Sequence, residues 1–203
     1  CAGYKAVAES LQRPMFYFDN NIMSTLSLLE CMEDSGVFKI IFSSSAIVYN
    51  DAQPLPLKET SKIGNTNNPY GNTKYIIERI LTDLSKSDKR WSIRIARYFN
   101  PISNHSTCLI KENPKGIPNN LVPYIIKVAQ KKFKSLKVFG KNFKTKDGTG
   151  VRDYIHKIPY KFTKKRKGDI AVSFCDSKKA LKELKWKARF SLKQSMLDIK
   201  KII

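Results

Sequence analysis

The fold is decided by residues 37–49, which read VFKIIFSSSAIVY. The run from Val37 to Ser43 is short, apolar and rich in β-branched and aromatic side chains, which is typical of a buried strand in a parallel sheet. The polar stretch Ser43-Ser44-Ser45-Ala46 ends this run. Open α/β sheets place ligand-binding residues at the carboxyl ends of their strands. The segment therefore predicts a buried strand with candidate site residues at its end.

Helix and strand patterns alternate on either side of this segment, which predicts an α/β layered fold. Residues before about 100 are typical of a layered sheet domain, and the later residues of a smaller, looser region. The predicted elements are a helix over 22–34 capped by Asp19 or Asn20, a helix over 70–84, a strand over 91–98, a helix over 121–131, a strand over 136–139, and tail helices over 177–184 and 191–203.

Composition excludes several classes of protein. With 41% hydrophobic residues in 203, the chain can bury a core, so wholesale disorder is excluded. No apolar run approaches the roughly 20 residues that cross a bilayer. The 4 cysteines lie far apart without a Cys-x-x-Cys pair, which argues against a zinc site and a disulfide scaffold. We therefore expect a reduced, cytoplasmic protein without a structural metal.

The net charge of +21 allows two interpretations. A basic protein can bind nucleic acid or another polyanion. The basic residues are mostly lysines, however, whereas the recognition of bases and phosphates favours the arginine fork. The excess is densest from Lys131 to Lys167, where a solvated lysine surface is the simpler interpretation. Composition thus argues against nucleic acid as the partner, and a polyanion-binding module remains an alternative.

Tyr70 and Lys74 are four residues apart, so a helix places both side chains on one face. A lysine cation beside a phenol stabilises the phenolate and lowers the phenol pKa, which makes tyrosine a usable general base. The spacing alone is weak, because chance yields about one such pair in this composition and Tyr160 and Lys164 form another. Whether Tyr70 and Lys74 form a catalytic pair therefore depends on the residues around them.

Three segments around this pair can converge on one cleft. Ser43-Ser44-Ser45-Ala46 ends one strand, Tyr70 begins the next helix, and Arg97-Tyr98-Phe99-Asn100-Pro101 ends the next strand. Carboxyl ends of parallel strands meet at one edge of the sheet. A serine hydroxyl there can share a proton with a substrate hydroxyl while Tyr70 removes that proton.

The chain resembles the UDP-glucose 4-epimerase family of the extended short-chain dehydrogenase/reductase superfamily. The resemblance covers most of the chain, and its blocks follow one another in family order. These blocks are AGYKAV (2–7), DNN (19–21), FSSSAIVY (42–49), NPYGNTK (68–74), RYFNP (97–101), GIPNNLVPYI (116–125), LKVFG (136–140), DGTGVRDYIH (147–156) and KKRKGDIA (164–171). Together they are far more specific than any one of them.

The resemblance implies a role for each matching residue. Ser45 and Tyr70 would be the catalytic pair, and Lys74 would bind the nicotinamide ribose and tune Tyr70. The residues implied to contact NAD are Cys1, Ala2, Gly3, Lys5, Asn20 and Phe99. Those implied to hold the UDP-sugar are Asn100, Asn120, Phe139, Arg152, Arg166 and Asp169. Arginine forks suit a pyrophosphate, and an aromatic ring suits uracil.

The resemblance also implies an activity and an assembly. Family members interconvert UDP-glucose and UDP-galactose through a 4-keto sugar, with tightly held NAD. Helices near 20–34 and 70–86 pack between subunits in family dimers, so we expect a homodimer. Ser173 stands where the family commonly has a bulkier residue in the sugar pocket. A small side chain there implies that UDP-N-acetylhexosamines are accepted as well.

Two departures from the family pattern accompany these matches. The 9 glycines form neither G-x-G-x-x-G nor G-x-x-G-x-x-G, the turn that seats the NAD pyrophosphate. In addition, His156 is followed almost directly by the block at 164–171, where the family has a longer segment. We therefore expect residues 1–100 to be the C-terminal part of a Rossmann-type NAD-binding domain, without its first strands, and residues 101–203 a truncated UDP-sugar-binding domain. An inactive fragment that keeps only the UDP-sugar half-site or the dimer surface is the alternative.

Overall fold

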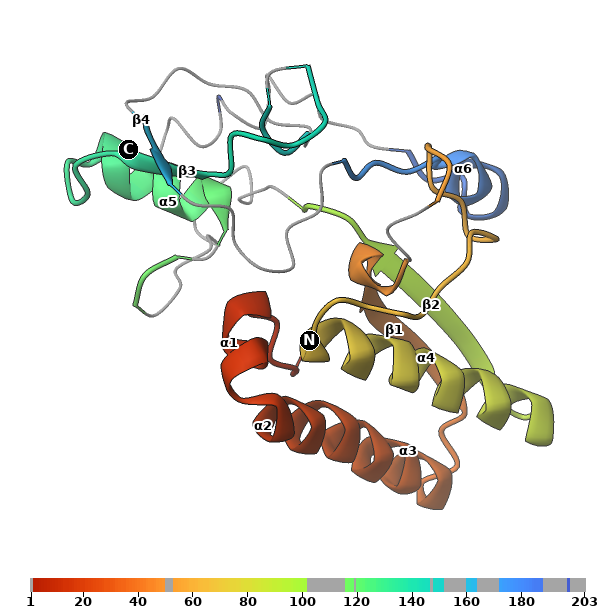
Figure 1. Ribbon diagram of the computed structural model, residues 1–203. Coiled ribbons are helices and arrows are strands. Elements are labelled where there is room, and N and C mark those ends of the chain that lie inside the picture. Colours follow the sequence, from red (N-terminus) through yellow and green to blue (C-terminus); the bar gives the residue numbers. More distant parts are fainter. Residues whose placement is uncertain are drawn as a thin grey trace. The chain divides into compact units, whose positions relative to one another are not determined.

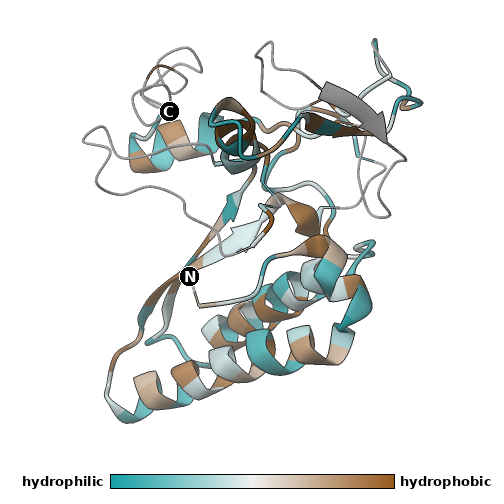
Figure 2. Cartoon of the chain, turned by 90° about the vertical axis from the view of Figure 1, so that its left-hand side faces the viewer, coloured by the Kyte–Doolittle hydropathy of each residue, from teal (hydrophilic) through white to brown (hydrophobic). Residues whose placement is uncertain are grey.

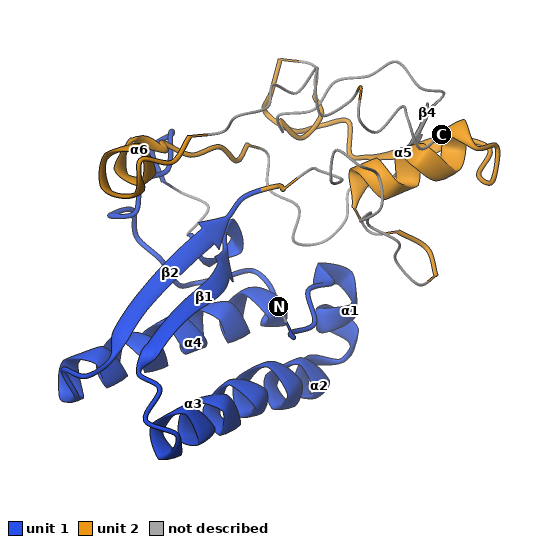
Figure 3. Ribbon diagram, turned by 180° about the vertical axis from the view of Figure 1, so that it is seen from behind, with its two compact units in different colours: residues 1–99 blue, residues 100–203 orange. Residues whose placement is uncertain are grey.

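The computed structural model describes residues 2–49, 53–101, 116–118, 120–146, 148–151, 160–163, 172–187 and 197. The chain divides into two compact units, Cys1–Phe99 and Asn100–Ile203, which Figure 3 colours separately. Unit 1 contains α1 (Val7–Gln12), α2 (Pro14–Phe18), η1 (Asp19–Met23), α3 (Ser24–Asp34), β1 (Lys39–Ser45), η2 (Ala46–Val48), α4 (Pro69–Ser87) and β2 (Ser92–Tyr98). Unit 2 contains α5 (Leu121–Ala129), β3 (Leu136–Phe139), β4 (Tyr160–Thr163) and α6 (Lys178–Leu184).

A βαβ arrangement forms the centre of unit 1 (Figure 1). Strands β1 and β2 are parallel, and α4 is the crossover helix between them. Their register pairs Ser44 with Arg97 and Ser45 with Tyr98. Both strands therefore end side by side, and the predicted α/β fold with a parallel sheet is confirmed.

Helices α3 and α4 cover one face of this sheet, as the opposite views of Figures 1 and 3 show. The buried cluster between them consists of Leu29, Ile77, Leu81 and Trp91, with Ile40 and Phe42 of β1 packed against it. Ile41 points to the other face and is 75% exposed. Apolar and polar residues alternate along both helices (Figure 2), as expected for helices with one buried side.

The helix predicted over 22–34 begins earlier than its sequence pattern indicates. Pro14 occupies the first position of a helical run that continues through α2, η1 and α3 to Asp34. The predicted caps, Asp19 and Asn20, instead lie inside this run, in the π-helical turn η1. Tyr17 explains the difference, because it is fully buried and its hydroxyl donates to Glu9 Oε2 at 2.8 Å. That packing, rather than a cap, fixes the preceding turns.

Strand β1 begins and ends two residues later than predicted. Its pairing with β2 begins at Lys39, while the Val37 amide donates to Met32 O at 2.8 Å and closes α3. At the other end, pairing with β2 keeps Ser44 and Ser45 in the strand. Ser44 and Ser45 therefore form the last two paired positions of β1 instead of the loop after the strand.

Unit 2 has a small parallel pair, in which β3 and β4 align Leu136 with Tyr160 and Phe139 with Thr163. The strand predicted over 136–139 is confirmed, whereas β4 and α1 were not predicted. The helix predicted over 121–131 ends at Ala129, because Lys131 adopts a left-handed φ of 58°. The tail helix over 191–203 lies outside the described residues apart from Leu197. Within the described part of the chain, every helix is too short or too polar to span a bilayer.

Removing the Leu81 side chain should destabilise unit 1 strongly. We expect Leu81→Ala to lower the free energy of unfolding by about 2–5 kcal/mol, because it leaves a cavity in the buried cluster. Urea unfolding in a Trp186→Phe background follows the fluorescence of Trp91, which lies in the same cluster. Leu184→Ala at an exposed position of α6 is the matched control. Equal losses in the two variants would contradict the assigned core.

Candidate active site

The start of α4 is fixed by local hydrogen bonds that set the position of Tyr70. Asn68 caps the helix, since its Oδ1 accepts from the Gly71 amide at 2.9 Å, and Pro69 occupies the first helical position. A Cβ on Gly71 would come within 2.9 Å of Thr66 Cβ, so only glycine allows this close approach. Tyr70 is thereby held in the first turn of the helix.

Tyr70 lies against Ser45 at the carboxyl end of β1. The Tyr70 side chain is 9% exposed, and the Ser45 hydroxyl is hydrogen-bonded to its phenol oxygen. Burial raises the pKa of Tyr70 above the usual value, while the hydrogen bond from Ser45 lowers it in part. Ser45 Oγ also accepts from the Ile47 amide at 3.4 Å. The predicted pair of serine and tyrosine is therefore in contact.

Lys74 lies one helical turn further along α4 and binds the same strand. Its Nζ donates to Ser43 O at 2.9 Å and lies 4.7 Å from the centre of the Phe42 ring. Burial lowers the pKa of Lys74. The sequence predicted that this ammonium lowers the pKa of Tyr70; in the structure that pKa is raised, because burial dominates. That expectation is wrong here, although the three catalytic candidates do converge.

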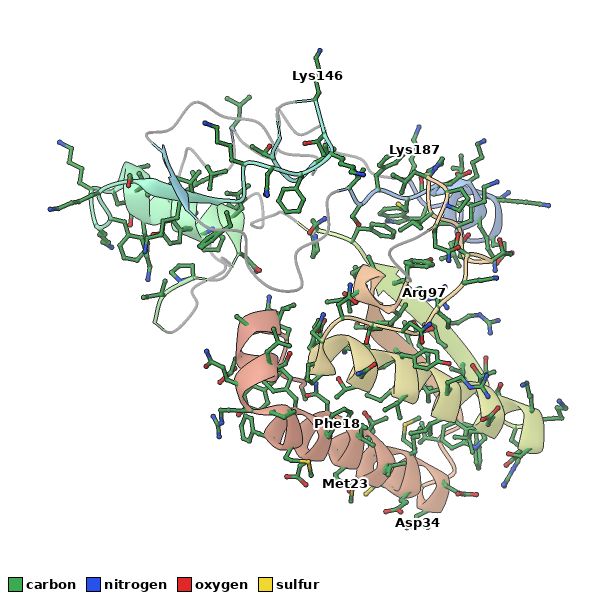
Figure 4. All side chains as sticks on the ribbon, in the orientation of Figure 1. Phe18, Met23, Asp34, Arg97, Lys146 and Lys187 are labelled. Carbon is green, nitrogen blue, oxygen red and sulfur yellow. The ribbon has the colours of Figure 1, made fainter. Side chains whose placement is uncertain are left out.

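Sequence reasoning missed a buried ion pair that borders these residues. Glu78, one turn beyond Lys74, is 2% exposed and accepts from Ser44 Oγ at 2.5 Å. Arg97 of β2, labelled in Figure 4, donates to the Glu78 carboxylate from Nε at 3.0 and 3.2 Å and from Nη2 at 2.8 Å. The four-residue repeat 70, 74, 78 was the signal in the sequence that pointed to Glu78.

The N-terminal segment, which contains the predicted cofactor residues Ala2, Gly3 and Lys5, is attached to η1. Asn21 accepts from the Tyr4 amide at 2.9 Å and donates to Tyr4 O at 3.0 Å. It also donates to Thr73 Oγ1 of α4 at 3.1 Å. A Cβ on Gly3 would come within 3.1 Å of Asn21 Oδ1, so the backbone passes close to this amide.

The predicted cofactor residue Asn20 does not make these contacts itself. Asn20 donates to Asn21 Oδ1 at 3.0 Å. Asn21, which the sequence analysis did not single out, is buried and joins the N-terminal segment to α4. Phe99 follows β2, with its ring centre 6.1 Å from that of Tyr49. Residues 2–5 are exposed and belong to the same unit as Asn20, Lys74 and Phe99. The roles of these residues in binding NAD stay predictions. Cys1 lies outside the described residues.

The predicted sugar-binding residues belong to unit 2. Asn120 is the residue before the first turn of α5, and Phe139 is the half-buried last residue of β3. Asn100 is exposed and begins unit 2. Arg152, Arg166 and Asp169 lie outside the described residues. Their roles in UDP-sugar binding therefore stay predictions.

Comparison with known proteins identifies the family. The sequence model that describes the NAD dependent epimerase/dehydratase family matches residues 1–157 of this chain. UDP-glucose 4-epimerase of Pasteurella multocida is 41% identical over 244 residues, which cover 97% of this chain and 72% of the relative. That alignment is longer than the 203 residues of the chain, so it includes residues of the relative without a counterpart here.

Two solved structures share the fold. UDP-glucose 4-epimerase from Bifidobacterium longum, in complex with NAD⁺ and UDP, matches with a TM-score of 0.92 and 39% identity, over 99% of this chain and 75% of that one. The enzyme from Stenotrophomonas maltophila, with bound NAD and formylated UDP-arabinopyranose, matches with a TM-score of 0.91 and 37% identity, over 98% and 73%. The chain belongs to the NAD dependent epimerase/dehydratase family, among the UDP-glucose 4-epimerases.

Proposed function

We propose that this chain is an isomerase that interconverts UDP-glucose and UDP-galactose through a 4-keto sugar. The observation that carries the proposal is the contact of Tyr70 with Ser45, beside Lys74, at the carboxyl end of β1. In a member of the epimerase family, that is the group of side chains that proton transfer at a sugar hydroxyl requires. The enzymes it resembles carry NAD, and NAD is the proposed cofactor here.

The proposed reaction assigns one task to each of these side chains. Tyr70 accepts the proton of the sugar 4-hydroxyl and later returns it, with Ser45 bridging phenol and sugar oxygen. Lys74 holds the nicotinamide ribose, while its bond to Ser43 O fixes the ammonium against the strand. NAD, when bound, would supply the hydride acceptor. The residues of unit 2, Asn120 and Phe139 among them, orient the UDP moiety.

The exposed side of α3 supports the proposed homodimer. Met23, the last residue of η1, and Leu28 of α3 are apolar and exposed, and Figure 4 shows Met23 pointing away from α4. Interfaces between subunits bury apolar side chains of this kind, and these two residues lie in the 20–34 segment that the family resemblance implies for the dimer. Cys31 of α3 is a thiol outside any disulfide, in keeping with the reduced cytoplasm proposed for this protein.

Tyr70→Phe should abolish the reaction. We expect a loss of about 10²- to 10⁴-fold in the interconversion of UDP-galactose and UDP-glucose, because the general base is removed. Product sugars are separated by anion-exchange chromatography, and NAD content is measured after release from the protein. UDP binding should persist in the variant, which separates chemistry from recognition. A wild-type chain that binds UDP but neither holds NAD nor interconverts the sugars would favour the inactive half-site.

Ser173 should allow N-acetylated sugars. Its side chain is small and buried, at 6% exposed, where the family resemblance implies a bulkier residue in the sugar pocket. We expect the wild-type chain to turn over UDP-GlcNAc, and Ser173→Tyr to lose at least about ten-fold of that activity while it keeps UDP-galactose turnover. A wild-type chain that converts UDP-galactose but not UDP-GlcNAc would contradict this role.

Leu28→Glu should separate the proposed dimer. A charge placed in an apolar interface is costly to desolvate, so we expect the variant to have half the mass of the wild type in size-exclusion chromatography with light scattering. Leu184→Glu, at an exposed position of α6, is the matched control and should leave the mass unchanged. A wild-type chain that is monomeric at micromolar concentration would remove the dimer from the proposal.

A further inference from the structure

One face of α4 contacts the three serines at the end of β1. Tyr70, Lys74 and Glu78, spaced at four residues, all bind within residues 43–45. The first two contacts belong to the proposed chemistry. The third, from Ser44 Oγ to the Glu78 carboxylate, involves neither a reacting group nor a solvent-exposed one. The role of this third contact therefore needs a separate explanation.

A hydrogen bond to Ser44 alone does not require a charged partner. A neutral amide can also accept from a hydroxyl, and a buried carboxylate is costly to desolvate unless it is paired. Arg97 provides the pairing with a fork of hydrogen bonds at 2.8–3.2 Å, and its own side chain is 17% exposed. Such forks restrict orientation more tightly than single hydrogen bonds. The pair is thus suited to hold Ser44 in one position.

Arg97 also binds the chain that leaves β1. Its Nη1 donates to the Tyr49 hydroxyl and to Glu59 O, each at 3.2 Å, and its guanidinium lies 5.0 Å from the centre of the Tyr49 ring. Arg97 is the register partner of Ser44 in the sheet. One guanidinium therefore restrains the chain on both sides of Ser45, at Ser44 through Glu78 and at Tyr49 directly.

We propose that Glu78 and Arg97 are positioning residues, which fix the strand end so that the Ser45 hydroxyl meets Tyr70. This role rests on the proposed epimerase function only for its effect on turnover. Its geometric part concerns the Ser45–Tyr70 hydrogen bond and can be tested without any reaction. Neither residue touches the reacting atoms, so both act through Ser44 and Ser45.

The electrostatics of Tyr70 support an action through geometry. Burial raises the pKa of Tyr70, and the Ser45 hydrogen bond lowers it in part. Glu78 lies two helical turns from Tyr70, and its carboxylate is paired with Arg97, so we expect it to act on the phenol through the position of Ser45. Loss of the Ser45 contact should raise the phenol pKa, because that hydrogen bond favours the phenolate.

The test compares four single variants with the wild type. Ser44→Ala cuts the link between the ion pair and the strand while it leaves Glu78 and Arg97 paired, so it should fold even if Glu78→Gln does not. Asp83→Asn, an exposed acid on the same helix, is the matched control. Ser45→Ala shows the full effect of losing the hydroxyl.

The readout is the protonation of Tyr70 in the full chain. The tyrosines are replaced by 3-fluorotyrosine, whose lower intrinsic pKa brings the titration into an accessible range, and the Tyr70 signal is assigned by fluorine NMR of Tyr70→Phe. We expect Ser44→Ala and Glu78→Gln to shift the titration to higher pH, in the direction of Ser45→Ala, and Asp83→Asn to leave it in place. With NAD and UDP-galactose, kcat should fall about 10- to 100-fold in Ser44→Ala, with KM nearly unchanged.

The outcomes separate the two proposals. A Tyr70 titration that stays at the wild-type pH in Ser44→Ala, with thermal stability lowered or not, overturns the positioning role. A wild-type chain without turnover, in which Ser44→Ala still shifts the titration, defeats the proposed function and leaves the positioning role standing. Unchanged kcat in Ser44→Ala of an active chain also contradicts positioning.

Discussion

The structure depends on the match between the helical repeat of α4 and the end of β1. Residues four apart on a helix lie one turn above one another, and here that repeat delivers a phenol, an ammonium and a carboxylate to consecutive serines. If the helix were rotated by one residue, Gly71 and Tyr75 would face the serines in place of Tyr70 and Lys74. The Asn68 cap and the tight approach of Gly71 to Thr66 prevent that rotation. The site is therefore a consequence of how α4 begins.

The buried residues of α4 serve two purposes. The apolar ones, Ile77 and Leu81, pack with Leu29 and Trp91 and supply the apolar area that stabilises unit 1. The buried polar side chains have partners on neighbouring elements, as Thr73 does with Asn21 and Glu78 with Ser44. One helix therefore contributes both to the core of unit 1 and to the candidate site.

Sequence patterns predicted β1, α4 and β2 of unit 1 and the pair of Tyr70 and Lys74 on one face of α4. The serines, Tyr70 and Lys74 could be found because each lies at a strand or helix end that the pattern marks. The Glu78–Arg97 pair could not, because it joins residues of different elements, and the sequence does not show which buried charges meet. The start of the first long helix was missed for a similar reason: Tyr17 is fixed by Glu9, a tertiary contact that a cap pattern does not reveal.

Burial raises the pKa of Tyr70 and lowers the pKa of Lys74, and both shifts favour the neutral side chain. The folded site therefore resists the phenolate that proton abstraction needs, and the Ser45 hydrogen bond offsets this only in part. A helix neighbour with an ammonium does not suffice, because Lys74 is held against Ser43 O. Further positive charge beside Tyr70 would lower its pKa and favour the phenolate. If a bound ligand brings that charge, proton abstraction in the proposed reaction is coupled to occupancy of the site.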